Sequence, residues 1–515
     1  MLFNSYEFLL LFLPICLIGY FQFGRISKNY GAIWLALCSI FFYAWWDYRY
    51  ILLLSGSIIG NYHAGRWIAQ HQGTKISKRL LIGAIAANLG LLAYYKYADF
   101  FILSANHMLG SAVPMLNIAL PIGISFFTFT QIAFLSDAYQ GKAKEFRFSY
   151  YVLFVTYFPH LIAGPVLHHK EMMPQFDVDR NYRPHLANFQ IGLTIFIIGL
   201  CKKVLIADSL AGYATPVFAP GANPGFFVAW GGLLAYSFQL YFDFSGYSDM
   251  AIGLSRLFGI KLPLNFNSPY KAANITDFWR RWHMTLSRFL RDYLYVPLGG
   301  NRKGPWRRKL NLVATMLLGG LWHGAGWTFV IWGGLHGLFL IINHAWQETT
   351  ARLGWAKGGR FALVLSVLLT FLCTNIAWVF FRAPDITTAF SVLRGIFGLN
   401  GAAIPAAILT RLDMLQPLTE ALHIGTFLGG GANFIANYVW IAVAAFITLA
   451  LPNTQELLRR YVPALPDSRQ AKQPSFALLP LRWKPTTVWA IAIGLAGAAG
   501  ALSLTRPSEF LYFQF

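Results

Sequence analysis

The chain has 515 residues, of which 56% are hydrophobic and only 12% are charged, and its formal net charge is +21. Soluble domains contain about 25% charged residues, so the composition indicates an integral membrane protein and excludes an ordinary soluble domain. An excess of Lys and Arg is typical of the cytoplasmic loops of membrane proteins. The charge therefore gives no reason to expect a nucleic-acid partner.

Apolar runs recur from end to end, and a run of about 17–25 residues is long enough to cross the hydrocarbon core as a helix. We predict an all-α, polytopic membrane protein with about 11–13 membrane helices, some of them re-entrant. No signal peptide is expected, because Met1–Glu7 lacks a basic n-region. The predicted spans lie near 7–22, 31–46, 49–64, 80–103, 117–138, 149–166, 187–206, 226–253, 309–332, 333–349, 361–381, 433–451 and 486–503.

We expect a single membrane domain over residues 1–515, with a functional core at roughly 115–350 and a polar cytoplasmic loop at 453–484. Basic clusters lie between the spans, and counting from an outside N-terminus places those before residue 148 in the cytoplasm. The four cysteines are scattered, with no spacing that suits a metal site or argues for a disulfide: Cys16, Cys38, Cys201 and Cys373. No metal site is predicted.

Two apolar segments in the first half of the chain carry unusual features. Residues 120–139 include several polar side chains, among them Gln131. Residues 157–165, YFPHLIAGP, contain two prolines and a glycine that interrupt a predicted span, as in broken or re-entrant membrane helices. His160 lies in this break, and we interpret it as a packing residue.

A polar face is predicted on the helix that contains residues 236–250, YSFQLYFDFSGYSDM. Gln239, Asp243 and Tyr247 recur at intervals of four residues and therefore share one side of the helix. Asp243 would be unfavourable in lipid without a partner, so this side should face a protein interior or a wet cavity. Two roles remain open for Gln239 and Asp243, hydrogen bonding between helices and contact with a substrate or donor.

Residues 274–300, NITDFWRRWHMTLSRFLRDYLYVPLGG, predict one amphipathic helix that lies in the membrane interface or re-enters from the basic side. Asn274 or Thr276 would cap it, and two ion pairs at a spacing of four are expected, Asp277 with Arg281 and Arg288 with Asp292. Arg281, Arg288 and Arg291 would form a basic stripe suited to phosphate groups. The alternative is an interfacial anchor with solvated arginines. His283 is interpreted as structural.

The segment 317–340, LLGGLWHGAGWTFVIWGGLHGLFL, is the most informative, because His323 and His336 lie in an almost wholly apolar stretch. Ionisable residues at membrane depth are often functional, and histidine is suited to proton transfer near neutral pH. Thirteen residues at about 100° each place the two rings on different faces of an unbroken helix. They converge only if the chain breaks or folds back, at Gly324 and Gly326 or at Gly333 and Gly334. The alternative is that both are packing histidines bonded to backbone carbonyls.

None of the common nucleophile or metal motifs is present: no GxSxG, no P-loop and no HExxH. An enzyme here would depend on histidine and on positioning. The residues by themselves leave three classes open, namely an acyltransferase, a proton-coupled transporter and a channel.

Six segments together resemble the membrane-bound O-acyltransferase family, and most closely its alginate O-acetyltransferase branch. They follow the family order through most of the chain, and the N-terminal segments 3–14 and 41–47 fit the same family. The six are LPIGISFFTFTQI (120–132), FPHLIAGPV (158–166), YFDFSGYSDMAIGL (241–254), FWRRWHMTLSRFLRDYLYVPLGGNRKG (278–304), LLGGLWHGAGW (317–327) and FLYFQF (510–515).

The resemblance implies a ring of membrane helices around a central tunnel, in the inner membrane of a bacterium. His323 matches the histidine that the family requires, and His336 matches its second recurring histidine. The implied donor is a cytoplasmic thioester, acetyl-CoA or an acyl carrier protein, and no bound cofactor is expected. The implied partners are a periplasmic SGNH-type O-acetyltransferase, the polysaccharide machinery and the lipid bilayer.

Alginate is the polymer that this resemblance favours. Acetylation of cellulose, of peptidoglycan or of another exopolysaccharide, and D-alanylation of teichoic acid, remain alternatives. The alternative from a different class is a proton-coupled transporter. It would move substrate in the absence of any acyl donor, with alternating access to one site.

Overall fold

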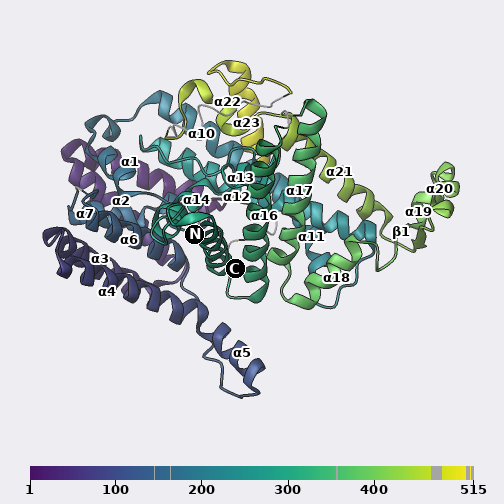
Figure 1. Ribbon diagram of the computed structural model, residues 1–515. Coiled ribbons are helices and arrows are strands. Elements are labelled where there is room, and N and C mark those ends of the chain that lie inside the picture. The colour runs from purple at the N-terminus through teal and green to yellow at the C-terminus, as the bar shows by residue number, and fades with distance from the viewer. Residues whose placement is uncertain (144, 163, 355–357, 466–477, 506–510, 512–515) are drawn as a thin grey trace.

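The computed structural model describes residues 1–515 except 144, 163, 355–357, 466–477, 506–510 and 512–515. The described chain is mostly helical, with only two short strands (Figure 1), in agreement with the predicted all-α class. Within the described residues, seven helical segments are long and apolar enough to cross a membrane, so the protein is a multi-pass membrane protein. They are Glu7–Ile26, Lys75–Leu109, Leu186–Phe218, Trp327–Arg352, Arg360–Arg382, Gly431–Ala450 and Thr487–Thr505. The predicted number of 11–13 also counts shorter or more polar helices.

The N-terminal part consists of two helical hairpins and an extension. In the second hairpin, the side chains of Asn61 and Asn88 exchange hydrogen bonds of 3.2 and 2.6 Å, which join the two helices through buried amides. The chain then continues through a π-helical turn, Ala93–Tyr97, into a helix that projects from the body (Figure 1). The helices are α1 (Leu13–Ile26), α2 (Lys28–Ala44), α3 (Ile51–Gln70), α4 (Lys75–Leu92) and α5 (Ala98–Leu109).

The predicted interruption at 157–165 is present. One helix stops at Thr156, and a four-residue helix, Phe158–Leu161, follows with Pro159 in its first turn, where proline is tolerated. The ring of His160 bonds to the carbonyl of Phe154 at 3.0 Å and is buried, which agrees with its interpretation as a packing residue. The helices here are α6 (Ile124–Tyr139), α7 (Phe148–Thr156), α8 (Phe158–Leu161) and α9 (His169–Met172).

A 32-residue helix, α12, forms the centre of the molecule, and every residue from Ala235 to Ser255 is buried. Its polar residues are therefore enclosed by protein, as the cost of exposing them to lipid requires. The helix lies against α10, with glycines on both helices at close approach; a Cβ on Gly253, for example, would lie 2.6 Å from the carbonyl oxygen of Gly192. The helices are α10 (Leu186–Cys201), α11 (Asp208–Ala214) and α12 (Phe226–Leu257).

The single amphipathic helix predicted over 274–300 is wrong. Asn274 does cap the start, since its side chain accepts from the amide of Asp277 at 2.9 Å. The helix stops after one turn, however, because His283 has a left-handed backbone (φ 41°) and the amide of Met284 bonds to the carbonyl of Asn265. The segment becomes α13 (Ile275–Trp279), α14 (Met284–Leu290) and a π-helical turn, Arg291–Tyr295.

The histidine-bearing segment folds as an antiparallel hairpin of α15 (Gly304–His323) and α16 (Trp327–Arg352). The predicted spans 309–332 and 333–349 are therefore divided at the wrong place: the break is at Gly324–Gly326. Gly333 lies inside α16. A Cβ there would collide with the carbonyl oxygen of Met316. It serves close packing of the two helices instead of a chain reversal.

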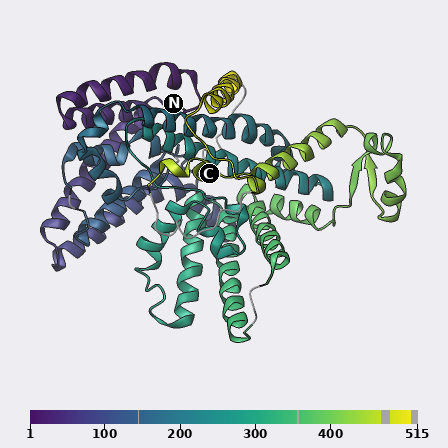
Figure 2. The ribbon, with the colours of Figure 1, turned by 90° about the horizontal axis from the view of Figure 1, so that it is seen from above.

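After the hairpin, α17 (Arg360–Arg382) packs beside α16 (Figure 1), and α15, α16 and α17 form a group to one side of the N-terminal helices (Figure 2). Two short strands pair in parallel in a segment that projects from the body in both views. Of the predicted loop 453–484, residues 466–477 lie outside the described part. The remaining elements are α18 (Ile386–Ile396), β1 (Ala403–Pro405), α19 (Ala406–Leu409), α20 (Gln416–Ala421), β2 (Gly425–Phe427), α21 (Gly431–Ala450), α22 (Thr454–Leu457) and α23 (Thr487–Leu502).

The close packing in the α15–α16 hairpin can be tested with adjacent glycines. Gly333→Ala introduces a methyl group against the backbone of Met316 and should destabilise the protein by about 1–3 kcal/mol. Gly334→Ala is the matched control, since its Cβ would meet only Leu317 Cδ2, at 3.5 Å. We expect a lower melting temperature in detergent for Gly333→Ala alone. Equal melting temperatures for the two variants would contradict this packing.

Candidate functional site

His323 is the last residue of α15, and aromatic side chains from three helices surround its ring. The nearest ring centroids are those of Trp322, Trp332 and Phe381, at 4.9, 5.1 and 5.2 Å. The side chain is 8% exposed. No hydrogen bond joins its imidazole to another residue in the described part of the chain.

His336 lies nine residues into α16 and is fully buried. The indole N–H of Trp279 donates to its Nδ1 at 3.3 Å. Because an indole nitrogen only donates, Nδ1 must be the acceptor, and the neutral ring then carries its proton on Nε2. Within the described residues Nε2 has no partner. Trp279 therefore fixes both the orientation and the tautomer of His336.

The hairpin brings the two predicted histidines into one aromatic cluster, in which both rings contact Trp332. The ring centroid of Trp332 is 5.1 Å from that of His323 and 4.9 Å from that of His336. Neither imidazole bonds to a backbone carbonyl in the described chain, whereas that of His160 does. The geometry therefore differs from that expected of two simple packing histidines.

A third histidine, His283, belongs to the same group, although the sequence suggested only a structural role. Its Nδ1 is 3.0 Å from Asn265 Oδ1, so the imidazole donates there and leaves Nε2 as an acceptor, with no partner in the described chain. Its ring centroid is 6.3 Å from that of His323. The left-handed backbone that turns it inward has no signature in a single sequence.

The sequence also gave no reason to place Lys96 and Tyr97 at this site. Lys96 Nζ donates to the carbonyls of Trp322 (2.6 Å) and His323 (3.1 Å), and the hydroxyl of Tyr97 donates to that of Leu321 (2.8 Å). The last carbonyls of a helix have no partner within it, and a positive charge near that end is favourable. Lys96 and Tyr97 thus hold the end of α15 from which His323 projects.

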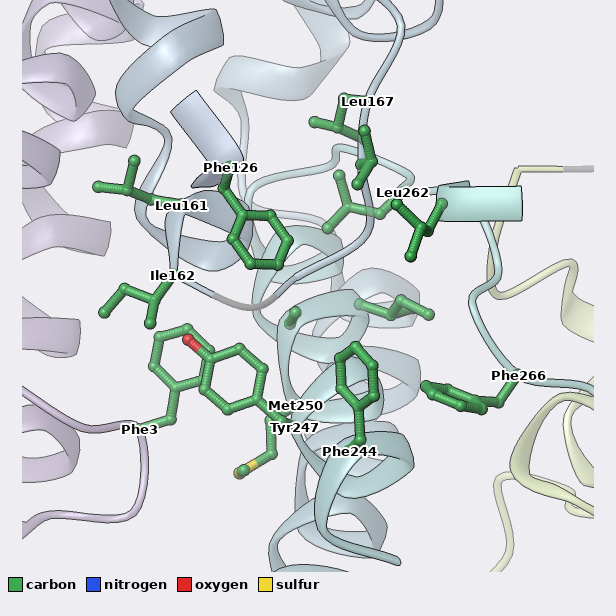
Figure 3. Close-up of a cluster of buried hydrophobic side chains, with 14 of the residues drawn as sticks. Phe3, Phe126, Leu161, Ile162, Leu167, Phe244, Tyr247, Met250, Leu262 and Phe266 are labelled. Carbon is green, nitrogen blue, oxygen red and sulfur yellow. The ribbon is translucent and has the colours of Figure 1, made fainter. Parts of the chain in front are cut away.

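A large apolar cluster adjoins this group on the side of α12. Phe126, Phe244 and Phe266 extend into it from three separate segments (Figure 3). Phe244 lies edge-on to His283 with ring centroids 4.7 Å apart, and Phe126 contacts Trp322 with centroids 5.7 Å apart. Side chains of this kind exclude water from the neighbourhood of His283 and Trp322.

Asp243 has the partner that its burial requires, since its carboxylate lies 2.8 Å from Lys203 Nζ, which also pairs with Asp208 at 2.6 Å. Asp243 thus belongs to an ion-pair cluster, while its neighbour Phe244 faces His283. Gln239 is buried, and its amide oxygen has no partner within the described chain. Of the two residues, Gln239 has the more available polar atom.

One of the two predicted arginine ion pairs is present. Arg281 bonds to Asp277 at 2.9 Å, as expected, and also to the carbonyl of Asn267 at 3.3 Å, and its side chain is only 7% exposed. The predicted pair of Arg288 with Asp292 is wrong. Arg288 binds Glu171 through two bonds of 2.6 and 2.8 Å, and Asp292 pairs with Arg291 instead. The three arginines do not form one helical stripe.

A second polar group lies near Arg288. The hydroxyl of Tyr293 is 3.0 Å from both Asp137 Oδ1 and His168 Nδ1. Asp137 is close to the end of α6, beside a basic loop that we predict to be cytoplasmic. A column of ring contacts joins this group to His323 through Phe289, Phe129 and Trp322, with centroid separations between 4.3 and 5.2 Å.

Comparison with known proteins identifies the family. The family description "membrane-bound O-acyltransferase" matches residues 37–383, which include both candidate histidines. The chain belongs to the membrane-bound O-acyltransferase family. It is therefore an acyltransferase, and the alternative of a proton-coupled transporter has no support.

Several similar proteins are named as O-acetylating enzymes of peptidoglycan or alginate. The chain is 47% identical to a peptidoglycan O-acetyltransferase of Helicobacter pylori, over 84% of this chain and 87% of the relative. It is 44% identical to a probable alginate O-acetylase of Pseudomonas aeruginosa, over 78% of this chain and 75% of the relative. It is 38% identical to a probable alginate O-acetylase of Pseudomonas putida over the full length of both. Together these relatives support O-acylation of a polymer at a membrane.

Proposed function

We propose that this acyltransferase transfers acetyl groups from a cytoplasmic thioester, acetyl-CoA or an acyl carrier protein, across a bacterial inner membrane for O-acetylation of alginate. The observation that carries the proposal is the aromatic cluster that holds His323 and His336, in a chain of this family. Alginate is chosen over peptidoglycan because three alginate O-acetylases align over the full length of both chains, although the peptidoglycan O-acetyltransferase has the higher identity, 47%. A periplasmic SGNH-type transferase would complete the transfer to polymer.

In the proposed reaction His323 acts as the general base. Its imidazole removes the proton from the acceptor hydroxyl as the oxygen attacks the thioester carbonyl carbon. The new C–O bond forms, the C–S bond breaks, and the imidazolium returns the proton to the leaving thiolate. His336, held by Trp279, would orient the reacting groups through its Nε2–H. A base at such a position typically contributes about 10²–10⁴-fold to the rate.

The donor would approach from the side of Arg288. A guanidinium suits the phosphates of CoA or of a phosphopantetheine arm. The Arg288 side chain is 22% exposed and lies one turn before Tyr293, from which the aromatic column leads to His323. Arg281 is also predicted to contact the acyl donor, but it is more deeply buried and forms two bonds within the protein. Of the two, Arg288 is therefore the better placed.

Replacement of the histidines tests the chemistry. We expect His323→Ala to lower alginate acetylation by about 10²–10⁴-fold, and His336→Ala to cause a smaller loss because that ring orients. His344→Ala, on the same helix α16, is the control and should retain activity. Acetyl esters are measured on alginate and on peptidoglycan in cells that lack the endogenous enzymes. Normal acetylation by well-expressed His323→Ala would refute its role, and esters on peptidoglycan alone would refute alginate as the polymer.

A donor titration tests the role of Arg288. Arg288→Gln should raise the donor concentration needed for half-maximal activity by about 10–100-fold, since a charge-assisted hydrogen bond contributes about 1.5–3 kcal/mol. Glu171→Gln leaves the guanidinium in place and should not raise it, and neither should Arg281→Gln. If Arg288 serves only its ion pair, Arg288→Gln and Glu171→Gln will both lose stability and keep the donor dependence of the unmodified protein. That result would remove Arg288 from the donor site.

A further inference from the structure

A groove runs along the outer side of the α3–α4 hairpin, well away from the histidines. Figure 1 shows these two helices side by side along one edge of the molecule. The groove has a volume of about 680 Å³, which is within the usual range of ligand sites, roughly 300–1,000 Å³. Its walls include Gly60, His63 and Trp67 from α3, and Arg79 and Gly83 from α4.

The groove is apolar at one end and basic at the other. Gly60 and Gly83 lie at the apolar end and leave open space, since a Cβ on either residue would meet no atom within 4 Å. Toward the α3–α4 turn, Trp67 and Arg79 line the mouth, and Trp67 is 55% exposed. Tryptophan favours the headgroup level of a membrane, and a long basic side chain extends to the same level. The groove thus has the polarity of a phospholipid.

The positive charges around the mouth have no acidic partners. Arg66, Lys75, Lys78 and Arg79 all lie near the turn, and none forms an ion pair within the described part of the chain. The sequence places this turn on the cytoplasmic side, where the leaflet surface is negative and attracts basic segments by about 1 kcal/mol per charge. These charges are complementary to an anionic headgroup.

The inner side of the hairpin is already packed against protein, so only the outer side is open to lipid. On the inner side a Cβ on Gly65 would collide with the ring of Phe134 on α6, and Gln131 of α6 donates to Ser57 at 2.9 Å. From the groove, α4 continues through its π-helical turn to Lys96, which holds the carbonyl of His323. An occupant of the groove would therefore steady the helix that supports the candidate site.

We propose that this groove binds an anionic phospholipid of the cytoplasmic leaflet. One acyl chain lies between α3 and α4 along Gly60 and Gly83, and the phosphate contacts Arg79 at the mouth. The inference does not depend on the identity of the acyl donor or of the polymer.

The test uses the full-length protein in nanodiscs of phosphatidylcholine, with or without phosphatidylglycerol. We expect phosphatidylglycerol to raise the melting temperature by a few degrees, because a ligand that binds only the folded state stabilises it. Native mass spectrometry should show phosphatidylglycerol bound to the protein after release. Arg79→Gln should weaken this binding about fivefold, as expected for the loss of one charge at the membrane surface.

Glycine variants distinguish the contribution of the acyl chain to binding from that of the headgroup charge. Gly83→Leu places a side chain in the groove at a position where the Cβ meets no atom within 4 Å, and it should abolish the phosphatidylglycerol effect. Gly90→Leu, on the same helix with equally open surroundings but outside the groove, should preserve the phosphatidylglycerol effect. Arg411→Gln should also preserve it, since Arg411 follows α19 and does not line the groove. The proposal fails if phosphatidylcholine alone stabilises equally, if Gly83→Leu retains the effect, or if inorganic phosphate reproduces it.

Discussion

The candidate site depends on how the last carbonyl groups of α15 are hydrogen-bonded. A helix that ends inside a protein leaves its last carbonyl groups without partners, and unpaired buried carbonyls are unfavourable. Here the ammonium of Lys96 and the hydroxyl of Tyr97 supply donors to three consecutive carbonyls, ending at that of His323. Both donors belong to the π-helical turn Ala93–Tyr97, which follows α4. The position of His323 is thus fixed by a residue more than two hundred positions away in sequence.

Once α15 ends at His323, the glycine turn and the close packing of α16 bring both His323 and His336 against Trp332. The three nearby histidines then differ in their bonding. His336 accepts from Trp279, His283 donates to Asn265, and His323 has no bond to its imidazole within the described residues. This difference is why we assign proton transfer to His323 and orientation to His336. The surrounding indole and phenyl rings provide an apolar wall that favours chemistry away from bulk water.

The sequence predicted the all-helical class and the break between the two histidines, because apolar runs and glycines are local signals. It did not identify which glycines break the chain. Gly333 is required for packing against Met316, and nothing in the local sequence distinguishes that use from a turn. The number of membrane crossings stays a prediction, because helices such as α12 are enclosed by protein and carry a weak hydropathy signal. The tunnel stays a prediction as well.

The prediction for the arginine segment, residues 274–300, is wrong for a different reason. The rule of four-residue spacing paired Arg288 with Asp292, whereas its partner Glu171 lies 117 positions away. Such long-range pairs, like that of Asp243 with Lys203, are set by packing of separate elements. The left-handed backbone of His283 is equally invisible in a sequence and divides the predicted helix in two. Local spacing thus identified the pair of Arg281 with Asp277 but not the partners of Arg288 and Asp243.

Hydrogen exchange at the end of α15 tests the central claim most directly. In Lys96→Met, peptides that cover residues 315–326 should exchange about tenfold faster or more, because one charge-assisted bond contributes about 1.5–3 kcal/mol. Lys28→Met is the control, since Lys28 also donates to a backbone carbonyl, that of Asp177 at 2.9 Å, in another part of the protein. It should leave exchange in residues 315–326 unchanged. Unaltered exchange of this segment in Lys96→Met would contradict the account.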